Sequence, residues 1–380
     1  MISSEKIPPA VSPYWSRLAA SLSPYIPGEQ PRDRKFIKLN TNENPYPPSP
    51  KVIEAIRNAA DSNLRLYPDP ACTAIREAAA VRWNVKPQQV FAGNGSDEIL
   101  AFAFAAFFDS CKNENAEPLL FPDITYSFYP VYAALWDIPF LTPATGAGFI
   151  INPDDYKTSC GGVIFPNPNA PTGRALDQDA IEEIVKCQNE NKNAVIIDEA
   201  YMAFANRGKT GTAIPLVSEY NNLLVIRTLS KDSALAGLRS GYAVGSEELI
   251  EGLCRIRDSF NSYTMDRLAQ AATAAAILDA AYCDEINARV SATRDRTAAA
   301  LRDLGFIVIP SEANFVFVSP PGKKTSGPSG SAAGLMQALR DRGILVRHFK
   351  QPKTENFLRI SIGTDEDMNA LLNACREICG

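Results

Sequence analysis

An apolar run followed by a lysine-bearing loop most constrains the fold of this chain. Residues 223–226 are apolar and partly β-branched, which indicates a buried strand. Ser230 and Lys231 follow in a loop, and Arg239 comes eight positions after the lysine. Two cations held together repel each other unless an anion lies between them. A lysine that forms a Schiff base with a phosphorylated cofactor, with the arginine on the phosphate, meets that need. Two ordinary surface side chains are the alternative at this point.

Three further apolar runs end in polar loops in the same way. Residues 194–197 lead to Asp198, residues 161–165 lead to an Asn/Pro/Gly turn, and residues 88–92 lead to a Gly-Asn-Gly-Ser-Asp turn that opens a helix. In an open parallel sheet, ligands bind in the crevice outside the carboxyl ends of the strands. The sequence therefore predicts an α/β fold with a mostly parallel sheet and a ligand site at these strand ends.

The length of the chain, 380 residues, suggests two domains rather than one. We expect a large cofactor-binding domain over residues 36–262, built as three layers, α/β/α. Alanine-rich helices and a last group of strands predict a smaller α+β domain over residues 263–380. Residues 1–35 are rich in Ser and Pro, and we expect an N-terminal arm there that packs with the smaller domain.

Composition excludes several classes of function. The formal net charge of −5 does not suggest a nucleic-acid surface. The single histidine, His348, rules out a multi-histidine metal site, and eight scattered cysteines are typical of a reducing compartment. The N-terminus lacks the apolar segment of a signal peptide, and the apolar run at residues 99–108 is too short to span a bilayer. We therefore expect a cytoplasmic protein that acts on small molecules, with no metal, nucleic acid or membrane.

Taken together, these motifs resemble those of fold-type-I pyridoxal-phosphate enzymes of the aminotransferase kind. LNTNENPYPPSP at residues 39–50, YPDP at residues 67–70 and FLRISIG at residues 357–363 narrow the resemblance to histidinol-phosphate aminotransferases. The resemblance runs from about residue 25 to the end of the chain. It implies pyridoxal 5'-phosphate as cofactor and a homodimer with shared active sites. The implied reaction converts histidinol phosphate and 2-oxoglutarate into imidazole acetol phosphate and glutamate, a step of histidine biosynthesis.

The resemblance assigns the cofactor ring to residues near the strand ends. Lys231 is the catalytic lysine, which holds the cofactor and then moves protons. Asp198 keeps the pyridine nitrogen protonated, and a carboxylate after a buried strand needs a cationic partner in any case. Tyr201 bonds the phenolic oxygen, and Tyr126 stacks on the ring. An ordinary helix N-cap is the alternative for Asp198, and a core tyrosine is the alternative for Tyr126.

The cofactor phosphate falls to a second group of residues. Glycines let the backbone approach a ligand, and free N–H groups at the start of a helix bind anions. The implied phosphate group comprises Gly95, Ser96, Asp97, Ser230 and Arg239. Asp97 would repel a phosphate, so we expect its side chain to point away, with Lys231 and Arg239 offsetting its charge. Tyr67 of the YPDP motif is implied to reach the phosphate in the neighbouring subunit.

One motif departs from the pattern of the resembling enzymes. They usually have asparagine directly before Pro-Thr-Gly, bonded to the phenolic oxygen of the cofactor. Here that position holds Ala170, and Asn169 precedes it. Either Asn169 takes the role through a small backbone shift, or the bond is missing, and we expect the former.

The substrate is assigned to five residues. Arg359 lies in an alternating stretch, on the face opposite its apolar neighbours, and an arginine in a pocket wants an anion. The resemblance gives it the phosphate of histidinol phosphate and the carboxylate of 2-oxoglutarate or glutamate. Arg347 is a second candidate for the phosphate, with a surface salt bridge as the alternative. Tyr25 is implied to reach the same phosphate, and the stiff polar loop with Asn42 and Asn44 is expected to line the pocket.

Three competing functions remain at this stage. An aromatic amino acid aminotransferase uses substrates that also carry a flat ring and an anionic end. A lyase similar to phosphothreonine decarboxylases uses a similar scaffold. A cofactor-binding regulator without catalytic activity is the third, but no DNA-binding segment is attached, and Lys231 and Asp198 are both present.

Overall fold

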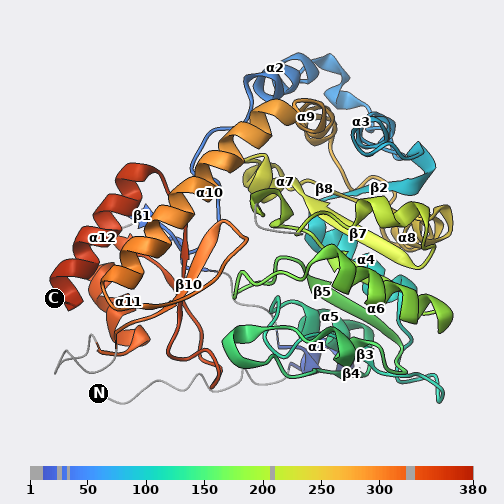
Figure 1. Cartoon of the computed structure of the whole chain (residues 1–380). Helices are drawn as coiled ribbons and strands as arrows, with labels where there is room; N and C mark the ends of the chain where they lie inside the picture. The colour runs from blue at the N-terminus through green and yellow to red at the C-terminus, as the bar shows by residue number, and fades with distance from the viewer. Residues whose placement is uncertain (1–11, 24–27, 32–34, 206–209, 322–329, 380) are drawn as a thin grey trace.

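Two main sheets organise the protein. The computed structural model of the chain describes residues 12–23, 28–31, 35–205, 210–321 and 330–379. Within them lie a seven-stranded sheet, a four-stranded sheet and a short two-stranded sheet. Figure 1 shows the two main sheets in separate parts of the molecule, joined by one long diagonal helix, α10.

The seven-stranded sheet has the order β2-β8-β7-β6-β5-β3-β4. β8 runs antiparallel to both of its neighbours, and the other pairs are parallel. The prediction of a mostly parallel sheet is therefore confirmed. The strands are β2 (Val90–Gly93), β3 (Leu119–Leu120), β4 (Phe140–Leu141), β5 (Gly162–Pro166), β6 (Val195–Asp198), β7 (Leu223–Thr228) and β8 (Gly241–Gly245).

Side chains alternate between the two faces of this sheet, and both faces are buried. Val163 and Val195 belong to one apolar core, while Ile164 and Ile196 belong to another. The first core is closed by α2 (Pro50–Ala59), α3 (Thr73–Trp83), α6 (Gln178–Glu190) and α9 (Arg267–Leu278). The second is closed by α4 (Ser96–Phe107), α5 (Tyr129–Trp136) and α8 (Glu247–Phe260). These are the expected three layers, α/β/α.

The four-stranded sheet is antiparallel and forms the α+β part of the fold. Its order is β12-β13-β10-β9, and it packs against α10, α11 and α12. Short strands β1 and β11 pair in parallel beside it. The elements are β1 (Ile37–Lys38), β9 (Ile307–Ile309), β10 (Phe315–Ser319), β11 (Ile344–Leu345), β12 (Arg347–His348), β13 (Leu358–Ser361), α10 (Ala280–Asp303), α11 (Ala332–Asp341) and α12 (Asp365–Cys379).

The packing of two elements bears on where the domains divide. Met265 and Ala272 belong to the first core of the large sheet, and α9 packs against α2 and α3. Leu39, just after β1, belongs instead to the core of the smaller sheet. We therefore propose that the smaller domain takes in β1 and begins within α10, rather than at residue 263. The arm helix α1 (Arg17–Ser21) buries no residue, and its packing with the smaller domain stays a prediction.

Among the described residues, no helix is both long and apolar enough to cross a bilayer.

Candidate active site

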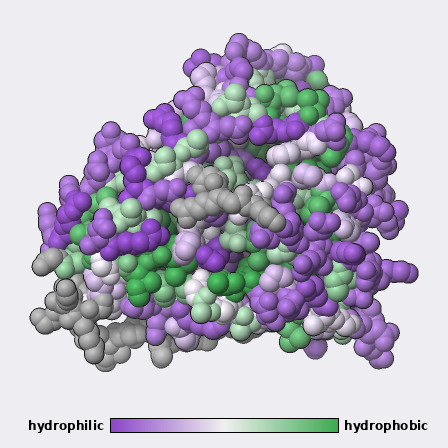
Figure 2. Space-filling model, in the orientation of Figure 1, coloured by the Kyte–Doolittle hydropathy of each residue, from purple (hydrophilic) through white to green (hydrophobic). Residues whose placement is uncertain are grey.

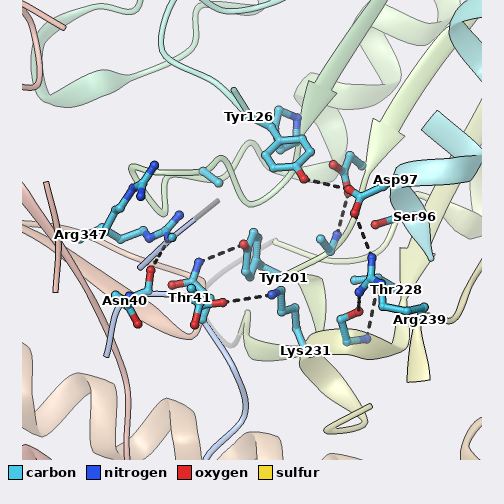
Figure 3. Close-up of a pocket in the computed structure, with 18 residues that line it drawn as sticks. Asn40, Thr41, Ser96, Asp97, Tyr126, Tyr201, Thr228, Lys231, Arg239 and Arg347 are labelled. Carbon is cyan, nitrogen blue, oxygen red and sulfur yellow. Dashed lines mark hydrogen bonds and ion pairs between the residues drawn. The ribbon is translucent and has the colours of Figure 1, made fainter. Parts of the chain in front are cut away.

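One cavity of about 160 Å³ brings most of the expected site residues together. It opens at the carboxyl ends of β2, β5, β6 and β7, and residues from β12 and β13 complete its wall. Figure 3 shows Arg347 and Arg239 on opposite sides of the cavity, with Tyr201 and Lys231 between them. The expected residues that line it are Asn42, Ser96, Asp97, Tyr126, Asp198, Tyr201, Ser230, Lys231, Arg239, Arg347 and Arg359.

Lys231 lies in a short helix that follows β7 directly. α7 (Leu229–Asp232) begins after Thr228, whose hydroxyl accepts a hydrogen bond from the Ser230 N–H at 3.2 Å. The Lys231 Nζ donates to the carbonyl of Thr41 at 3.3 Å. Burial, and then the charge of Arg359, lower the pKa of Lys231 to about 8. A lysine with a lowered pKa is neutral more often and is a better nucleophile.

Asp198 ends β6 and is 4% exposed. Its carboxylate accepts from the Tyr129 hydroxyl at 3.2 Å and from the Ala200 N–H at 3.1 Å. Neither contact supplies a positive charge. Burial raises the pKa of Asp198 to about 7, and Asp97 and Glu199 add to the effect. A cation placed in the cavity, such as a protonated pyridine nitrogen, would stabilise this carboxylate.

The N-terminus of α4 forms one end of the cavity. Ser96 is its first residue, and Arg239 reaches the same place from the loop before β8. The Arg239 guanidinium donates to Ser230 Oγ at 3.4 Å. Gly95 precedes Ser96 with φ +86°, and a Cβ there would lie 3.0 Å from the Arg239 Nη2. Free N–H groups, hydroxyls and a guanidinium so arranged bind an anion such as a phosphate ester.

Asp97 lines the cavity, contrary to the expectation that its side chain points away, and Arg239 offsets its charge. Its carboxylate accepts from Arg239 Nη2 at 3.0 Å and from the Tyr126 hydroxyl at 2.8 Å (Figure 3). Burial and the neighbouring Asp97 raise the pKa of Tyr126, which keeps its hydroxyl protonated as a donor. The expected repulsion of a phosphate by Asp97 is thereby reduced.

The opposite wall carries a second site suited to an anion. Arg347 on β12 and Arg359 on β13 are directly paired across the two antiparallel strands. Both line the cavity, and the Arg359 Nη2 donates to the Asn40 carbonyl at 3.1 Å. The pair is thus poised for a phosphate or a carboxylate.

The remaining expected residues lie off the cavity. Gly95 directly precedes Ser96 in the sequence. Asn44 donates to the Lys231 carbonyl at 3.0 Å. Tyr67 is 79% exposed and stacks on Tyr263, with 4.6 Å between ring centroids, so it does not line this cavity. Tyr25 lies outside the described residues.

Asn169 and Ala170 differ from the expectation in which of them faces the cavity. Ala170 lines it, whereas the Asn169 amide donates to the Ile124 carbonyl at 2.8 Å and to Thr172 Oγ1 at 3.2 Å. Asn169 is fully buried in the turn that it stabilises. A bond from Asn169 to the cofactor therefore has no support from this geometry.

Sequence reasoning missed two contacts of the site. Tyr129 holds Asp198, and the backbone carbonyl of Thr41 accepts from Lys231. Tyr129 follows Tyr126 by three positions, a spacing that places both on one side of a helical turn, and this was the signal available. The role of a backbone carbonyl leaves no trace in residue type.

The groups in the cavity fit pyridoxal phosphate. Three groups match the aldehyde, the ring nitrogen and the phosphate of the cofactor: an amine, a buried carboxylate that is bonded by no cation among the described residues, and an anion-binding helix end. The arginine pair adds room for an anionic substrate on the other side.

Comparisons with known proteins agree with this chemistry. The family model "Aminotransferase class I and II" matches residues 34–375. The chain is 50% identical over 371 residues to histidinol-phosphate aminotransferase 1 of Bordetella parapertussis, covering 97% of this chain and 99% of the relative. It is 51% identical over 372 residues to the histidinol-phosphate aminotransferase of Aromatoleum aromaticum, covering 97% and 99%.

Solved structures show the same fold. Histidinol-phosphate aminotransferase from Sinorhizobium meliloti, in complex with pyridoxal-5'-phosphate, has a TM-score of 0.83 at 24% identity, covering 97% of this chain and 98% of that one. A mutant aspartate aminotransferase of Thermus thermophilus has a TM-score of 0.79 at 20% identity, covering 97% and 100%. On the family match and the relatives at about half identity, the chain belongs to the class I and II aminotransferase family.

Proposed function

We propose that this aminotransferase uses pyridoxal phosphate to convert histidinol phosphate and 2-oxoglutarate into imidazole acetol phosphate and glutamate, in the cytoplasm. The observation that carries the proposal is a single cavity with anion-binding groups on two opposite sides and Lys231 between them. One side suits the phosphate of the cofactor, and the other suits the phosphate of the substrate. The relatives named above as histidinol-phosphate aminotransferases support this choice.

The residues of the chain would divide the work as follows. Bound pyridoxal phosphate supplies an electron sink for a carbanion next to the substrate nitrogen. Ser96, Ser230 and Arg239 would hold its phosphate, and Asp198 would hold the proton on its ring nitrogen. Lys231 Nζ, once displaced by the amino substrate, would carry the proton from the substrate carbon. Its lowered pKa, about 8, suits a base that works near neutral pH.

Arg347 and Arg359 would serve both halves of the reaction. In the first half they would bind the phosphate of histidinol phosphate, and in the second a carboxylate of the oxo acid. Both guanidinium groups line the cavity from adjacent strands, which suits either anion. Asn42 and Asn44 hold their loop in place by donating to the Tyr201 hydroxyl and to the Lys231 carbonyl.

We also propose a homodimer in which Tyr67 serves the cavity of the other subunit. Tyr67 is 79% exposed, and Phe260 and Leu278, at the C-terminal ends of α8 and α9, are 73% and 61% exposed. Figure 2 shows hydrophobic side chains gathered over α9 at the top of the molecule. Apolar surface of this kind is typical of an interface. An aromatic hydroxyl that has no place in its own cavity gains one if a second copy covers this surface.

The test is a single-turnover spectrum of the cofactor-loaded enzyme without any oxo acid. Mixing with histidinol phosphate is expected to remove the visible absorption of the bound cofactor rapidly, and Arg359→Gln is expected to slow this step at a given concentration. A faster response to phenylalanine would instead favour an aromatic amino acid aminotransferase. No response to either compound, with the absorption intact, would favour the lyase.

A further inference from the structure

The cavity wall lacks the amide that bonds the cofactor's phenolic oxygen in the resembling enzymes, and a different amide contacts the Tyr201 hydroxyl. Ala170 lines the cavity at the position where the resembling enzymes usually have an asparagine, and a methyl group donates no hydrogen bond. Asn169 directs its amide into its own turn. From a different loop, Asn42 Nδ2 donates to the Tyr201 hydroxyl oxygen at 3.0 Å. These two residues lie 159 positions apart in the sequence.

Ser361 fixes which end of the Asn42 amide faces Tyr201. The backbone N–H of Asn42 donates to Ser361 Oγ at 2.8 Å. The proton of the serine hydroxyl is then directed to Asn42 Oδ1, also at 2.8 Å. With its oxygen engaged by the serine, the amide presents its N–H to the tyrosine. Asn42 is 1% exposed, so water competes little for either end.

We propose that Asn42 is a positioning residue that acts through Tyr201 on the proton at Lys231 Nζ in the cofactor-loaded enzyme. A hydroxyl that accepts a hydrogen bond is polarised and becomes a stronger donor. Tyr201 so polarised stabilises negative charge on the phenolic oxygen of the cofactor. Because the Tyr201 hydroxyl shares this negative charge, the phenolic oxygen attracts the proton on the neighbouring Lys231 nitrogen less strongly. The pKa of the Lys231 nitrogen is therefore lowered. The inference rests on the proposed use of pyridoxal phosphate but not on the identity of the substrate.

The same arrangement joins the two parts of the fold. Ser361 and Arg359 lie two positions apart on β13, so their side chains share one face of the strand. Arg359 donates to the Asn40 carbonyl while Ser361 bonds Asn42, so β13 holds the loop at two points. The hydrogen-bond chain to Tyr201 thus starts on the strand that carries the proposed substrate arginine.

The test is a pH titration of the visible absorption of the cofactor-loaded enzyme without substrate, which reports the proton at Lys231 Nζ. Asn42→Ala is expected to raise this pKa by about one unit. The double variant Asn42→Ala/Ala170→Asn, which returns an amide to the cavity wall, is expected to bring it back. In a Tyr201→Phe background, Asn42→Ala is expected to change little, because the amide acts through the hydroxyl.

Two further variants separate this role from general support of the loop. Asn314 Nδ2 donates to the backbone carbonyl of Asn42 at 3.0 Å. Asn314→Ala therefore loosens the same loop but keeps the amide on Tyr201, and the pKa is expected to move by less than about 0.3 unit. Ser361→Ala leaves the amide free to turn over, and a smaller rise than that of Asn42→Ala is expected.

The proposal is overturned if Asn42→Ala leaves the titration unchanged, or if it produces the same shift with and without the Tyr201 hydroxyl. Should Asn42→Ala fail to fold, Ser361→Ala decides alone, and an unchanged pKa overturns the proposal. An enzyme that develops no pH-dependent visible absorption with pyridoxal phosphate overturns both this inference and the proposed function. If the pKa shifts of the variants are as expected but the enzyme does not react with histidinol phosphate, the inference is supported and only the proposed substrate is rejected.

Discussion

Asp198 and Lys231 are both held in the cavity against their preferred charge states. Burial raises the pKa of Asp198 to about 7 and lowers the pKa of Lys231 to about 8. The two side chains therefore spend part of their time neutral near physiological pH. A ligand with a ring cation for the carboxylate and a carbonyl for the amine relieves both. Cofactor binding is thus coupled to the unfavourable burial of these two charged groups.

Asp198→Asn is expected to stabilise the cofactor-free protein while it weakens cofactor binding. The raised folded pKa means that the folded state binds the extra proton, so stability falls as pH rises from about 4 to about 7. The Asp198→Asn variant avoids this loss. We expect its free energy of unfolding to exceed that of the wild type by about 2–4 kcal/mol at pH 8, and by less than half of that at pH 5. Urea unfolding of the two proteins at both pH values measures the difference. An asparagine variant that is equally or less stable at pH 8 would contradict the argument.

The attachment of pyridoxal phosphate to the cofactor-free enzyme is expected to quicken as pH rises and to level off above about 8, since the neutral amine of Lys231 is the nucleophile. Arg359 lowers the pKa of Lys231 and Glu43 raises it. Arg359→Gln should therefore move the midpoint up, and Glu43→Gln should move it down. Stopped-flow absorbance gives the midpoints. Shifts of the same sign in both variants would rule out this electrostatic cause.

At the scale of elements, one buried ion-pair network ties β6, β7 and α7 together. Arg227 on β7 donates to Glu199 at 3.0 Å and to Asp232 at 3.4 Å. Glu199 directly follows Asp198, and Asp232 directly follows Lys231. Arg227 thus fixes the relative position of the two segments that carry Asp198 and Lys231.

Arg227→Met is expected to lower the free energy of unfolding by about 3–5 kcal/mol, because it leaves the fully buried Glu199 without its cation. The matched control is the exposed helical pair of Arg255 and Glu251. Arg255→Met should cost no more than about 0.5 kcal/mol. Chemical denaturation of the cofactor-loaded enzymes measures both. Equal losses would show that burial of the network does not set its importance.

The helices and strands also show which features of the fold and the site could be predicted from the sequence. Apolar runs with polar loops behind them predicted the strands and the crevice at their ends, since the carboxyl ends of parallel strands share one edge. Which of Asn169 and Ala170 faces the cavity depends on a one-residue difference in the path of a turn, which residue type does not encode. The contact of Asn42 with Tyr201 joins distant segments, so no local pattern announces it. The alanine-rich α9 similarly carries no sign of which core it joins.

At the scale of the whole molecule, the position of Tyr67 has a consequence for assembly. Its ring is exposed on the surface, stacked on Tyr263, and takes no part in the cavity of its own chain. Most oligomers of identical chains are closed dimers, in which a surface residue of one copy can complete a site of the other. If Tyr67 works in this way, two inactive variants can repair each other.

Co-expression of Lys231→Ala with Tyr67→Ala is expected to restore activity that neither variant has alone. In the mixed dimer, the subunit that keeps Lys231 receives an intact Tyr67 from its partner, so one complete site forms. Random pairing makes half of the dimers mixed, with one working site each, which gives about a quarter of wild-type activity. A mixture no more active than the separate variants would place Tyr67 in its own subunit or outside the site. Light scattering on the same samples checks that the particle is a dimer.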